Sequence, residues 1–180
     1  MSDSVLEQWL ARENEVRAMY AQGTGTGSND LEDIRTQTGL ALMQGMMNGT
    51  RPGPSISKTM DFLLVEVASG HAVFQGTPGE KYFNPMGTVH GGWYATLLDS
   101  ALGCAVHTLM PAGRAYTTSQ LNVNLVKAIG PKVQRVRAEG KVVHCGRQLA
   151  TAEARLYGPD GTLYAHATTT CLVFDIPTKS

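Results

Sequence analysis

The chain has 180 residues, 42% of them apolar, which is enough for a single domain that buries on the order of 70% of its unfolded surface. Its fifteen Lys and Arg residues balance fifteen Asp and Glu residues, so no overall field favours nucleic acid or an anionic membrane as a partner. The first ten residues lack a signal-peptide pattern and no stretch approaches ~18 uninterrupted apolar residues, so we expect a cytoplasmic protein without a membrane span.

A helical extension is predicted at the N-terminus. Within residues 5–21, apolar side chains recur at loosely helical spacing among charged ones, which predicts an amphipathic helix packed on the body of the protein or on a partner. Residues 22–29 (QGTGTGSN) indicate a flexible connector and do not fit the G-x-G-x-x-G pattern of a dinucleotide site. A second helix is predicted over 30–47, stopped by Asn48-Gly49.

The remainder is predicted to contain six strands and one long helix. Alternating segments at 60–68 and 71–77 around Ser69-Gly70 predict a hairpin, and a loop at 84–92 leads into an apolar helix at 93–110. Four further strands are predicted at 116–126, 133–143, 149–157 and 163–174. We interpret these four as a meander, in one antiparallel sheet around the buried helix: an α+β fold with an extension at 1–50 and a main domain at 51–180.

Asp99 is the only carboxylate in the apolar run WYATLLDSALGCAVHTLM, which spans residues 93–110. A carboxylate inside a segment that must otherwise be buried costs several kcal/mol unless another group pairs with it or uses it. The sequence therefore indicates a functional site at Asp99.

The loop before this helix reads N-P-x-G-x-x-H-G-G, from Asn84 to Gly92. Its glycines let the backbone approach a ligand closely, and the unpaired amides at the helix start suit a carbonyl oxygen that develops negative charge. Taken alone, the same residues fit a tight turn with His90 or Thr88 as the helix cap.

Gly91 and Asp99 are eight positions apart, which on a helix means about 12 Å along the axis and about 80° around it. One carbonyl group cannot lie within ~3 Å of both. If the two residues cooperate, they meet across two chains, and a two-fold dimer with antiparallel helices would bring Gly91 of one chain opposite Asp99 of the other. The functional interpretation thus predicts a homodimer.

Other catalytic centres are disfavoured. Cys104, Cys145 and Cys171 have neither C-x-x-C nor zinc-type spacing, which indicates three buried thiols, and no G-x-S-x-G elbow is present. His107 could pair with Cys104, but near the end of an apolar helix we interpret it as a hydrogen-bonded polar residue. The other histidines lack ligand spacing, so no metal is expected.

With these motifs in place, the chain resembles the hot-dog-fold thioesterases of the phenylacetate-degradation (PaaI-like) type. The resemblance covers roughly residues 60–174. It rests on Asn84, Pro85, Gly87, His90, Gly91, Gly92, Asp99, Gly103, the strand segment from Thr118 to Leu125 (TSQLNVNL), Gly146-Arg147 and the segment from Asp160 to Ala165 (DGTLYA).

The resemblance implies a curved antiparallel sheet around one long helix, assembled as dimers or dimers of dimers that hydrolyse acyl-CoA thioesters. It implies Asp99 as general base or nucleophile and the Gly91 amide, next to Gly92, as the oxyanion donor. It further implies that Asn84 positions the thioester, that His90 supports the loop, and that a strand hydroxyl orients water. Thr118 matches this hydroxyl best, with Thr117 as the neighbour that a one-residue register change would substitute. No cofactor is expected, since coenzyme A is part of the substrate.

The substrate contacts are less defined. Met86 and the aromatic residues near the loop suit an aromatic or medium-length acyl chain, although they equally suit interface packing. Arg147, Lys127, Lys132 and Arg114 are candidates for the coenzyme A phosphates. Relatives usually carry Arg-Pro near Lys127, where this chain has Lys-Ala.

Two other hypotheses stay open. A dehydratase acting on hydroxyacyl thioesters would more naturally carry a catalytic His in another context than the His90-Gly91-Gly92 seen here. A non-catalytic acyl-CoA-binding or regulatory module is suggested by residues 1–50, which lie outside the resemblance. Retention of Asp99 argues against that module, since a dead site has no physical need for a buried carboxylate.

Overall fold

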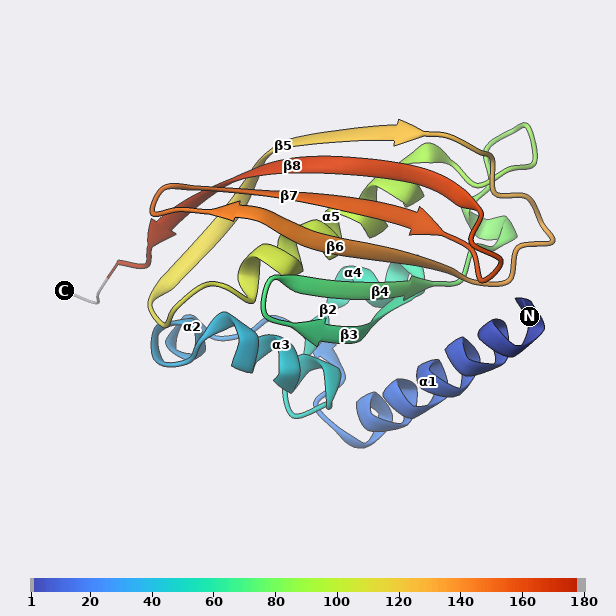
Figure 1. Cartoon of the computed structure of the whole chain (residues 1–180). Coiled ribbons are helices and arrows are strands. Elements are labelled where there is room, and N and C mark those ends of the chain that lie inside the picture. Colours follow the sequence, from blue (N-terminus) through green and yellow to red (C-terminus); the bar gives the residue numbers. More distant parts are fainter. Residues whose placement is uncertain (1, 178–180) are drawn as a thin grey trace.

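The fold, seen in a computed structural model that describes residues 2–177, is one curved sheet wrapped around a long helix (Figure 1). The N-terminal part holds α1 (Ser2–Gln22), β1 (Thr26–Gly27), α2 (Leu31–Thr36), α3 (Gly39–Met47), β2 (Gly53–Pro54) and α4 (Ser55–Met60). The sheet and central helix are β3 (Phe62–Ala68), β4 (His71–Gly76), a 3-10 turn η1 (Glu80–Tyr82), α5 (Gly91–His107), β5 (Arg114–Leu125), β6 (Val136–Cys145), β7 (Leu149–Tyr157) and β8 (Leu163–Asp175). No helix within residues 2–177 is both long and apolar enough to cross a membrane.

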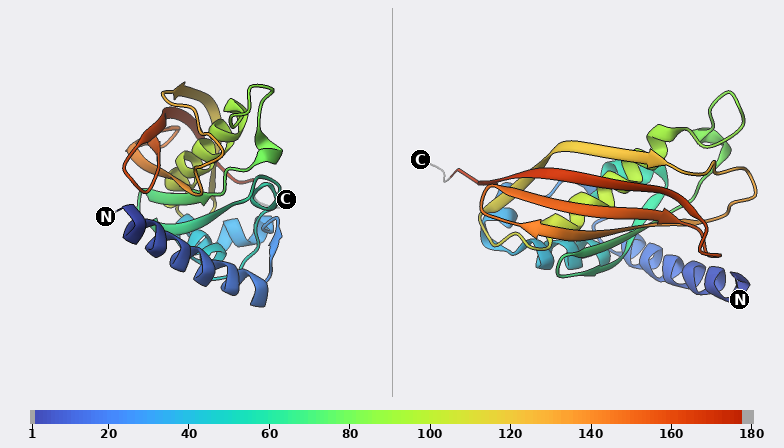
Figure 2. Two further views of the ribbon diagram at one scale, coloured as in Figure 1. Left: turned by 90° about the vertical axis from the view of Figure 1, so that its right-hand side faces the viewer. Right: turned by 45° about the horizontal axis from the view of Figure 1, so that its top comes forward.

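All six long strands pair antiparallel, in the order β3-β4-β6-β7-β8-β5. The end-on view in Figure 2 shows the sheet curling around α5. Apolar residues at helical spacing give α5 its buried side: Trp93, Tyr94, Leu97, Leu98, Ala101, Leu102, Ala105 and Val106. The predicted α+β class with one antiparallel sheet around one helix is confirmed.

Helix α5 lies directly on β6 because Gly140 has no side chain. A Cβ at Gly140 would stand 2.4 Å from the carbonyl oxygen of Ala101, closer than any real contact. The glycine therefore sets the distance between helix and sheet, and with it the position of every residue that α5 carries.

The predicted meander is wrong for its first strand. β5 pairs with β8, from Arg114 opposite Asp175 to Leu125 opposite Ala165, and leaves β6 to pair with β4 and β7. The physical reason is the connection at 126–135, which is too long for a tight hairpin and instead crosses the end of the sheet (Figure 1). β5 is thus an edge strand with one unpaired side.

The predicted helix over 30–47 is two helices. α2 ends before Gln37, and α3 starts afresh because Thr38 caps it, its hydroxyl accepting from the Ala41 amide at 3.3 Å. The first predicted strand also starts later, at Phe62, since Met60 belongs to the short helix α4, which the sequence analysis missed. The division at residue 50 stays a prediction; β1 pairs in parallel with β2, just beyond that point.

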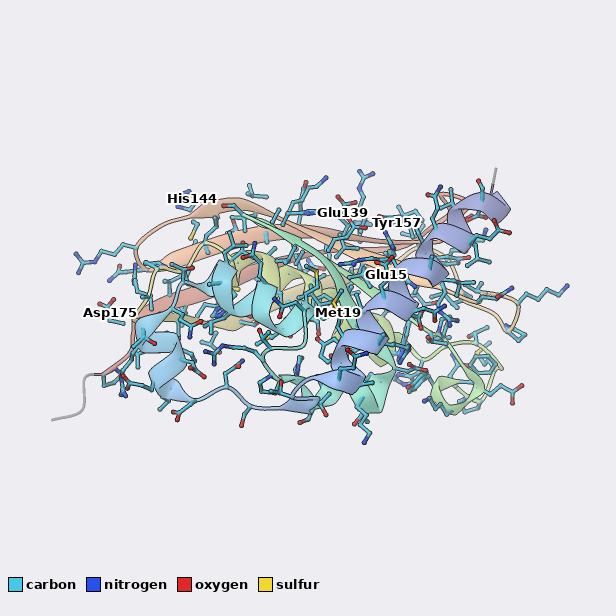
Figure 3. The ribbon with its side chains drawn as sticks, turned by 90° about the horizontal axis from the view of Figure 1, so that it is seen from below. Glu15, Met19, Glu139, His144, Tyr157 and Asp175 are labelled. Carbon is cyan, nitrogen blue, oxygen red and sulfur yellow. The ribbon has the colours of Figure 1, made fainter. Side chains whose placement is uncertain are left out.

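Helix α1 packs on the β3–β4 face opposite α5, as the predicted amphipathic helix should (Figure 3). Trp9 and Val16 are buried there, but Met19 is 37% exposed. The buried side also holds a carboxylate, Glu13, which is only 4% exposed. Docking of α1 therefore involves ionic as well as apolar contacts.

Candidate functional site

The loop before α5 is organised by the Asn84 side chain. Its Oδ1 accepts from the amides of Met86 (2.9 Å) and Thr88 (3.3 Å), and its Nδ2 donates to the Thr88 hydroxyl at 3.0 Å. Gly87 closes the turn in the left-handed region with φ +78°, which favours glycine. The structure thus gives Asn84 a loop-forming role, and Thr88 belongs to that turn.

His90 is the cap of α5, one of the two possibilities left by the sequence. Its Nδ1 accepts from the Gly92 amide at 2.9 Å, and its carbonyl accepts from the Trp93 amide at 3.0 Å. Among the described residues, the Gly91 amide has no acceptor. A free N–H at the positive end of a helix is suited to an anionic or polarised oxygen.

Side-chain packing also favours glycine at position 91. A Cβ there would meet the Cδ1 atom of Leu125 at 2.9 Å. Leu125 is 56% exposed and Met86 is 88% exposed, so two apolar side chains face solvent at this end of α5 in the single chain. Exposed large apolar residues beside a polar site are typical of an interface or a ligand-binding surface.

Ile129 and Tyr94 hold the loop by hydrogen bonds, and the sequence analysis missed this support. The Val89 amide donates to the carbonyl of Ile129 at 3.0 Å, and the Ile129 amide donates to the hydroxyl of Tyr94 at 2.6 Å. A tyrosine on the buried face of a helix needs a partner for its hydroxyl, and this was the available signal. The sequence could not say that the partner lies 35 residues away.

Asp99 lies on the partly exposed side of α5, next to the edge strand β5. It is half-buried rather than enclosed, so the predicted buried carboxylate is corrected: the apolar run covers the other side of the helix. Its Oδ1 accepts from the hydroxyl of Thr118, in β5, at 3.1 Å. The side chain of Thr117 points to the opposite face of the strand and is exposed. Of the two hydroxyls, only that of Thr118 contacts Asp99.

The thiols near Asp99 are not nucleophiles. Burial raises the pKa of Cys104 to about 12, and the nearby Asp99 charge adds to the effect, so this side chain is a neutral thiol at physiological pH. Cys171 is fully buried and burial likewise raises its pKa, whereas Cys104 and Cys145 are partly exposed, contrary to the prediction of three buried thiols.

His107 differs from its prediction as well. Its Nδ1 is buried without a hydrogen-bond partner among the described residues, so it is not the satisfied polar group that we expected. Burial lowers its pKa and keeps the ring neutral, packed on Tyr116 at 5.7 Å between ring centroids. The described residues contain no group of three His, Cys, Asp or Glu side chains arranged to bind a metal.

Gly91 and Asp99 belong to one uninterrupted helix, which separates them by about 12 Å. They therefore cannot act on one carbonyl within a single chain. Between Gly91 and Cys104, the residues of α5 that are not buried form one stripe of mostly small side chains: Gly91, Gly92, Ala95, Thr96, Asp99, Ser100 and Cys104. Such a stripe allows a second helix to approach closely.

The candidate phosphate-binding cations do not gather in one place. Lys127 follows the end of β5, beside the Gly91 loop, while the carbonyl of Arg147 accepts from Arg114 at the start of β5. The 12 residues of β5 put these ends about 35–40 Å apart. Arg114 is further occupied by Asp175, with Nε and Oδ1 2.9 Å apart. One chain alone cannot use Lys127 and Arg147 on the same phosphates.

Part of this chain is similar in sequence to known proteins. Residues 86–165 match the thioesterase superfamily. A proposed esterase of Halobacterium salinarum is 34% identical over 91 residues, which are 51% of this chain and 56% of that protein, so the chain spans little more than half the length of this relative.

Solved structures share the fold over most of their length. The phenylacetic acid degradation-related protein of Ralstonia eutropha JMP134 has a TM-score of 0.67 at 24% identity, covering 73% of this chain and 98% of that chain. A thioesterase family protein of Silicibacter pomeroyi has a TM-score of 0.62 at 26% identity, with coverages of 67% and 90%. A mutant of the phenylacetic acid degradation protein PaaI of Thermus thermophilus has a TM-score of 0.60 at 26% identity, with coverages of 65% and 96%.

Proposed function

Since this chain belongs to the hot-dog-fold thioesterases, we propose that it hydrolyses acyl-CoA thioesters at sites shared between two subunits. One observation carries the proposal: α5 presents a free Gly91 amide at its start and the Asp99–Thr118 pair on its partly exposed side. An amide donor and a carboxylate are the two groups that thioester hydrolysis requires, and no cofactor is needed.

The chemistry follows from these two groups. The thioester carbonyl oxygen accepts from the Gly91 amide, which stabilises the negative charge that develops as the carbon becomes tetrahedral. Asp99 either removes a proton from the attacking water or adds to the carbon itself, and the C–S bond breaks to release the coenzyme A thiolate, which takes up a proton. If Asp99 adds, the mixed anhydride that forms is then hydrolysed by water, which releases the acid and regenerates the carboxylate. Thr118 fixes the carboxylate, and its oxygen can accept a hydrogen bond from the water.

In a two-fold dimer, Gly91 and Asp99 of different subunits can lie close to each other. With two α5 helices antiparallel and in contact through their small-residue stripes, Gly91 of one subunit would lie opposite Asp99 of the partner subunit. The unpaired side of β5 supports the same arrangement, because a 12-residue edge strand with few charges is readily extended by a second copy. The dimer would also bring the Arg147 end of one subunit towards the Lys127 end of the other.

The acyl group is proposed to be aromatic or of medium length. Leu125, beside Gly91, and Met86, in the loop before it, are exposed apolar side chains that suit an apolar acyl chain better than a charged one. Coenzyme A phosphates would take Lys127 as a cation at the rim of the same site.

Turnover of several acyl-CoAs by the wild-type protein and by Asp99→Asn tests the proposal. Phenylacetyl-, hydroxybenzoyl-, short-chain and long-chain acyl-CoAs should be compared by thiol release. We expect hydrolysis of at least one of them, and a loss of about 10²–10⁴-fold in Asp99→Asn, since the amide can neither take a proton nor attack. Unchanged turnover in Asp99→Asn would refute the mechanism. Tight binding without hydrolysis of any acyl-CoA would favour the non-catalytic module instead.

A further inference from the structure

Tyr94 lies in the first turn of α5, three residues after Gly91, and its hydroxyl is used twice. The oxygen accepts from the Ile129 amide at 2.6 Å, and the hydroxyl donates to the Lys127 carbonyl at 3.3 Å. Tyr94 is only 2% exposed, so water does not compete for these bonds. Burial raises the pKa of Tyr94, so its hydroxyl stays protonated and able to donate at neutral pH.

Ile129 connects the two sides of the Gly91 turn. Its amide is bound to Tyr94, after Gly91, while its carbonyl accepts from the amide of Val89, before Gly91, at 3.0 Å. Ile129 is fully buried and Val89 is 4% exposed. The backbone from Val89 to Tyr94 is therefore closed into a ring by one residue from another part of the chain.

The residues that hold this ring are themselves anchored to the sheet. The amides of Val126 and Lys127 both donate to the carbonyl of Tyr164 in β8, at 2.8 and 3.1 Å. The ring is thus fixed to the sheet through residues 126–129. Gly91 itself contributes no side chain to hold its own amide in place, so its position depends on these neighbours.

We propose that Tyr94 is a positioning residue for the oxyanion-binding amide of Gly91, an inference that rests on the proposed function. Through Ile129, it fixes the peptide that carries the amide, so that the N–H does not have to be ordered during the reaction. Preorganised donors of this kind are effective because their alignment costs nothing at the transition state. The hydroxyl of Tyr94 does not contact substrate in this scheme.

Tyr94→Phe tests the inference because it removes one oxygen atom and keeps the ring. The Ile129 amide then loses its acceptor, and we expect faster hydrogen exchange at the Ile129 and Val89 amides. We also expect kcat to fall about tenfold while KM for the best acyl-CoA changes less than about twofold, since the misplaced amide matters most at the transition state.

Tyr157→Phe is the matched control. Like Tyr94→Phe, it removes a single tyrosine hydroxyl, but this one lies in β7, away from the loop, and donates to the Glu139 carboxylate at 3.4 Å. Its kcat and the exchange of the Val89 amide should equal those of the wild-type protein. Thermal unfolding of both variants, with activity normalised to folded protein, separates a local effect from a general loss of structure.

The outcomes distinguish the inference from the proposed function. Unchanged exchange at Val89 in Tyr94→Phe would show that the ring does not depend on the hydroxyl and would overturn the inference. Faster exchange with unchanged kcat would overturn the positioning role while leaving the thioesterase proposal intact. If the wild-type protein hydrolyses no acyl-CoA, both the positioning role and the proposed function are refuted. Asp99→Asn would then show no difference in turnover from the wild-type protein.

Discussion

At the scale of single residues, the Gly91 amide can be removed without disturbing the helix. Proline is well tolerated at the first position of a helix, and His90 already has the extended backbone (φ −64°, ψ 138°) that a following proline requires. Gly91→Pro therefore deletes the N–H but should keep the fold intact. If this amide has the proposed oxyanion role, kcat for acyl-CoA should fall about 10²–10³-fold.

Gly91→Ala separates this loss from crowding. It brings a similar contact with the flexible end of Leu125 but keeps the N–H, so its kcat should stay within about threefold of the wild-type value. Steady-state kinetics of the two variants side by side make the comparison. Equal losses in both would mean that the space at position 91, and not its amide, matters for the reaction.

At the scale of elements, the contact between α5 and β6 leaves no room for a side chain at Gly140. A Cβ at Gly140 would collide with the backbone carbonyl of Ala101, which cannot move without the helix. We expect Gly140→Ala to destabilise the fold by about 2–3 kcal/mol, measured by urea unfolding. Gly79→Ala is the control, because a Cβ at Gly79 has no neighbour within 4 Å; equal stability of the two variants would contradict the close packing of α5 on β6.

The same elements show what the sequence could and could not predict. Helical spacing located α5, and alternation located the strands, because burial on one side leaves a periodic signal. Alternation does not identify the neighbouring strand, so β5 was predicted to pair with β6 across a connection of residues 127–132. In the structure β6 begins only at Val136, and β5 pairs with β8. Alternation also could not decide whether Thr117 or Thr118 contacts Asp99, because that depends on which face of β5 meets α5.

The site was partly predictable for a similar reason. Asp99 and the Gly91 loop stood out because their residue types conflict with their surroundings in the sequence. The residues that support the loop did not stand out in the sequence, because Tyr94 and Ile129 are ordinary core residues whose hydrogen bond joins distant segments. Contacts of that kind are visible only in three dimensions.

At the scale of the whole molecule, α1 is attached to the sheet through Glu13. Its carboxylate accepts from Arg135 at 2.6 Å, Arg17 at 2.8 Å and Gln75 at 2.8 Å. Burial alone would raise the pKa of Glu13, but these hydrogen bonds hold it below its ordinary value of 4.5. The carboxylate thus stabilises the folded state at neutral pH, and this contribution is lost as the pH falls below 4.5 and through the folded pKa.

Glu13→Gln should therefore destabilise the protein by about 2 kcal/mol at pH 7, since it weakens charged hydrogen bonds to arginines that keep part of their surface in water. The difference from wild type should shrink towards pH 4, measured by urea unfolding across pH. Glu15→Gln is the control on the same helix: Glu15 has 61% of its side chain exposed, and its bond to Arg12 should contribute less than about 0.5 kcal/mol. A pH-independent difference would show that Glu13 acts through packing alone.

The assembly itself is tested by mixing two inactive variants. If each site takes its amide from one subunit and its carboxylate from the other, a mixed dimer of Gly91→Pro and Asp99→Asn has one site with both defects and one site with none. Random exchange of equal amounts makes about half of all dimers mixed, so activity should recover to about a quarter of the wild-type value. Subunits are exchanged in mild denaturant, and thiol release is measured before and after.

A site contained in a single chain predicts the opposite result, because every subunit in the mixture would still carry one defect. The free edge of β5 and the small-residue stripe on α5 favour recovery, since both surfaces are suited to a second copy. Mixing each variant with itself controls for effects of the exchange procedure. Activity that stays at the level of the separate variants, in dimers shown by mass spectrometry to be mixed, would rule out a shared site and require Gly91 and Asp99 to serve different steps.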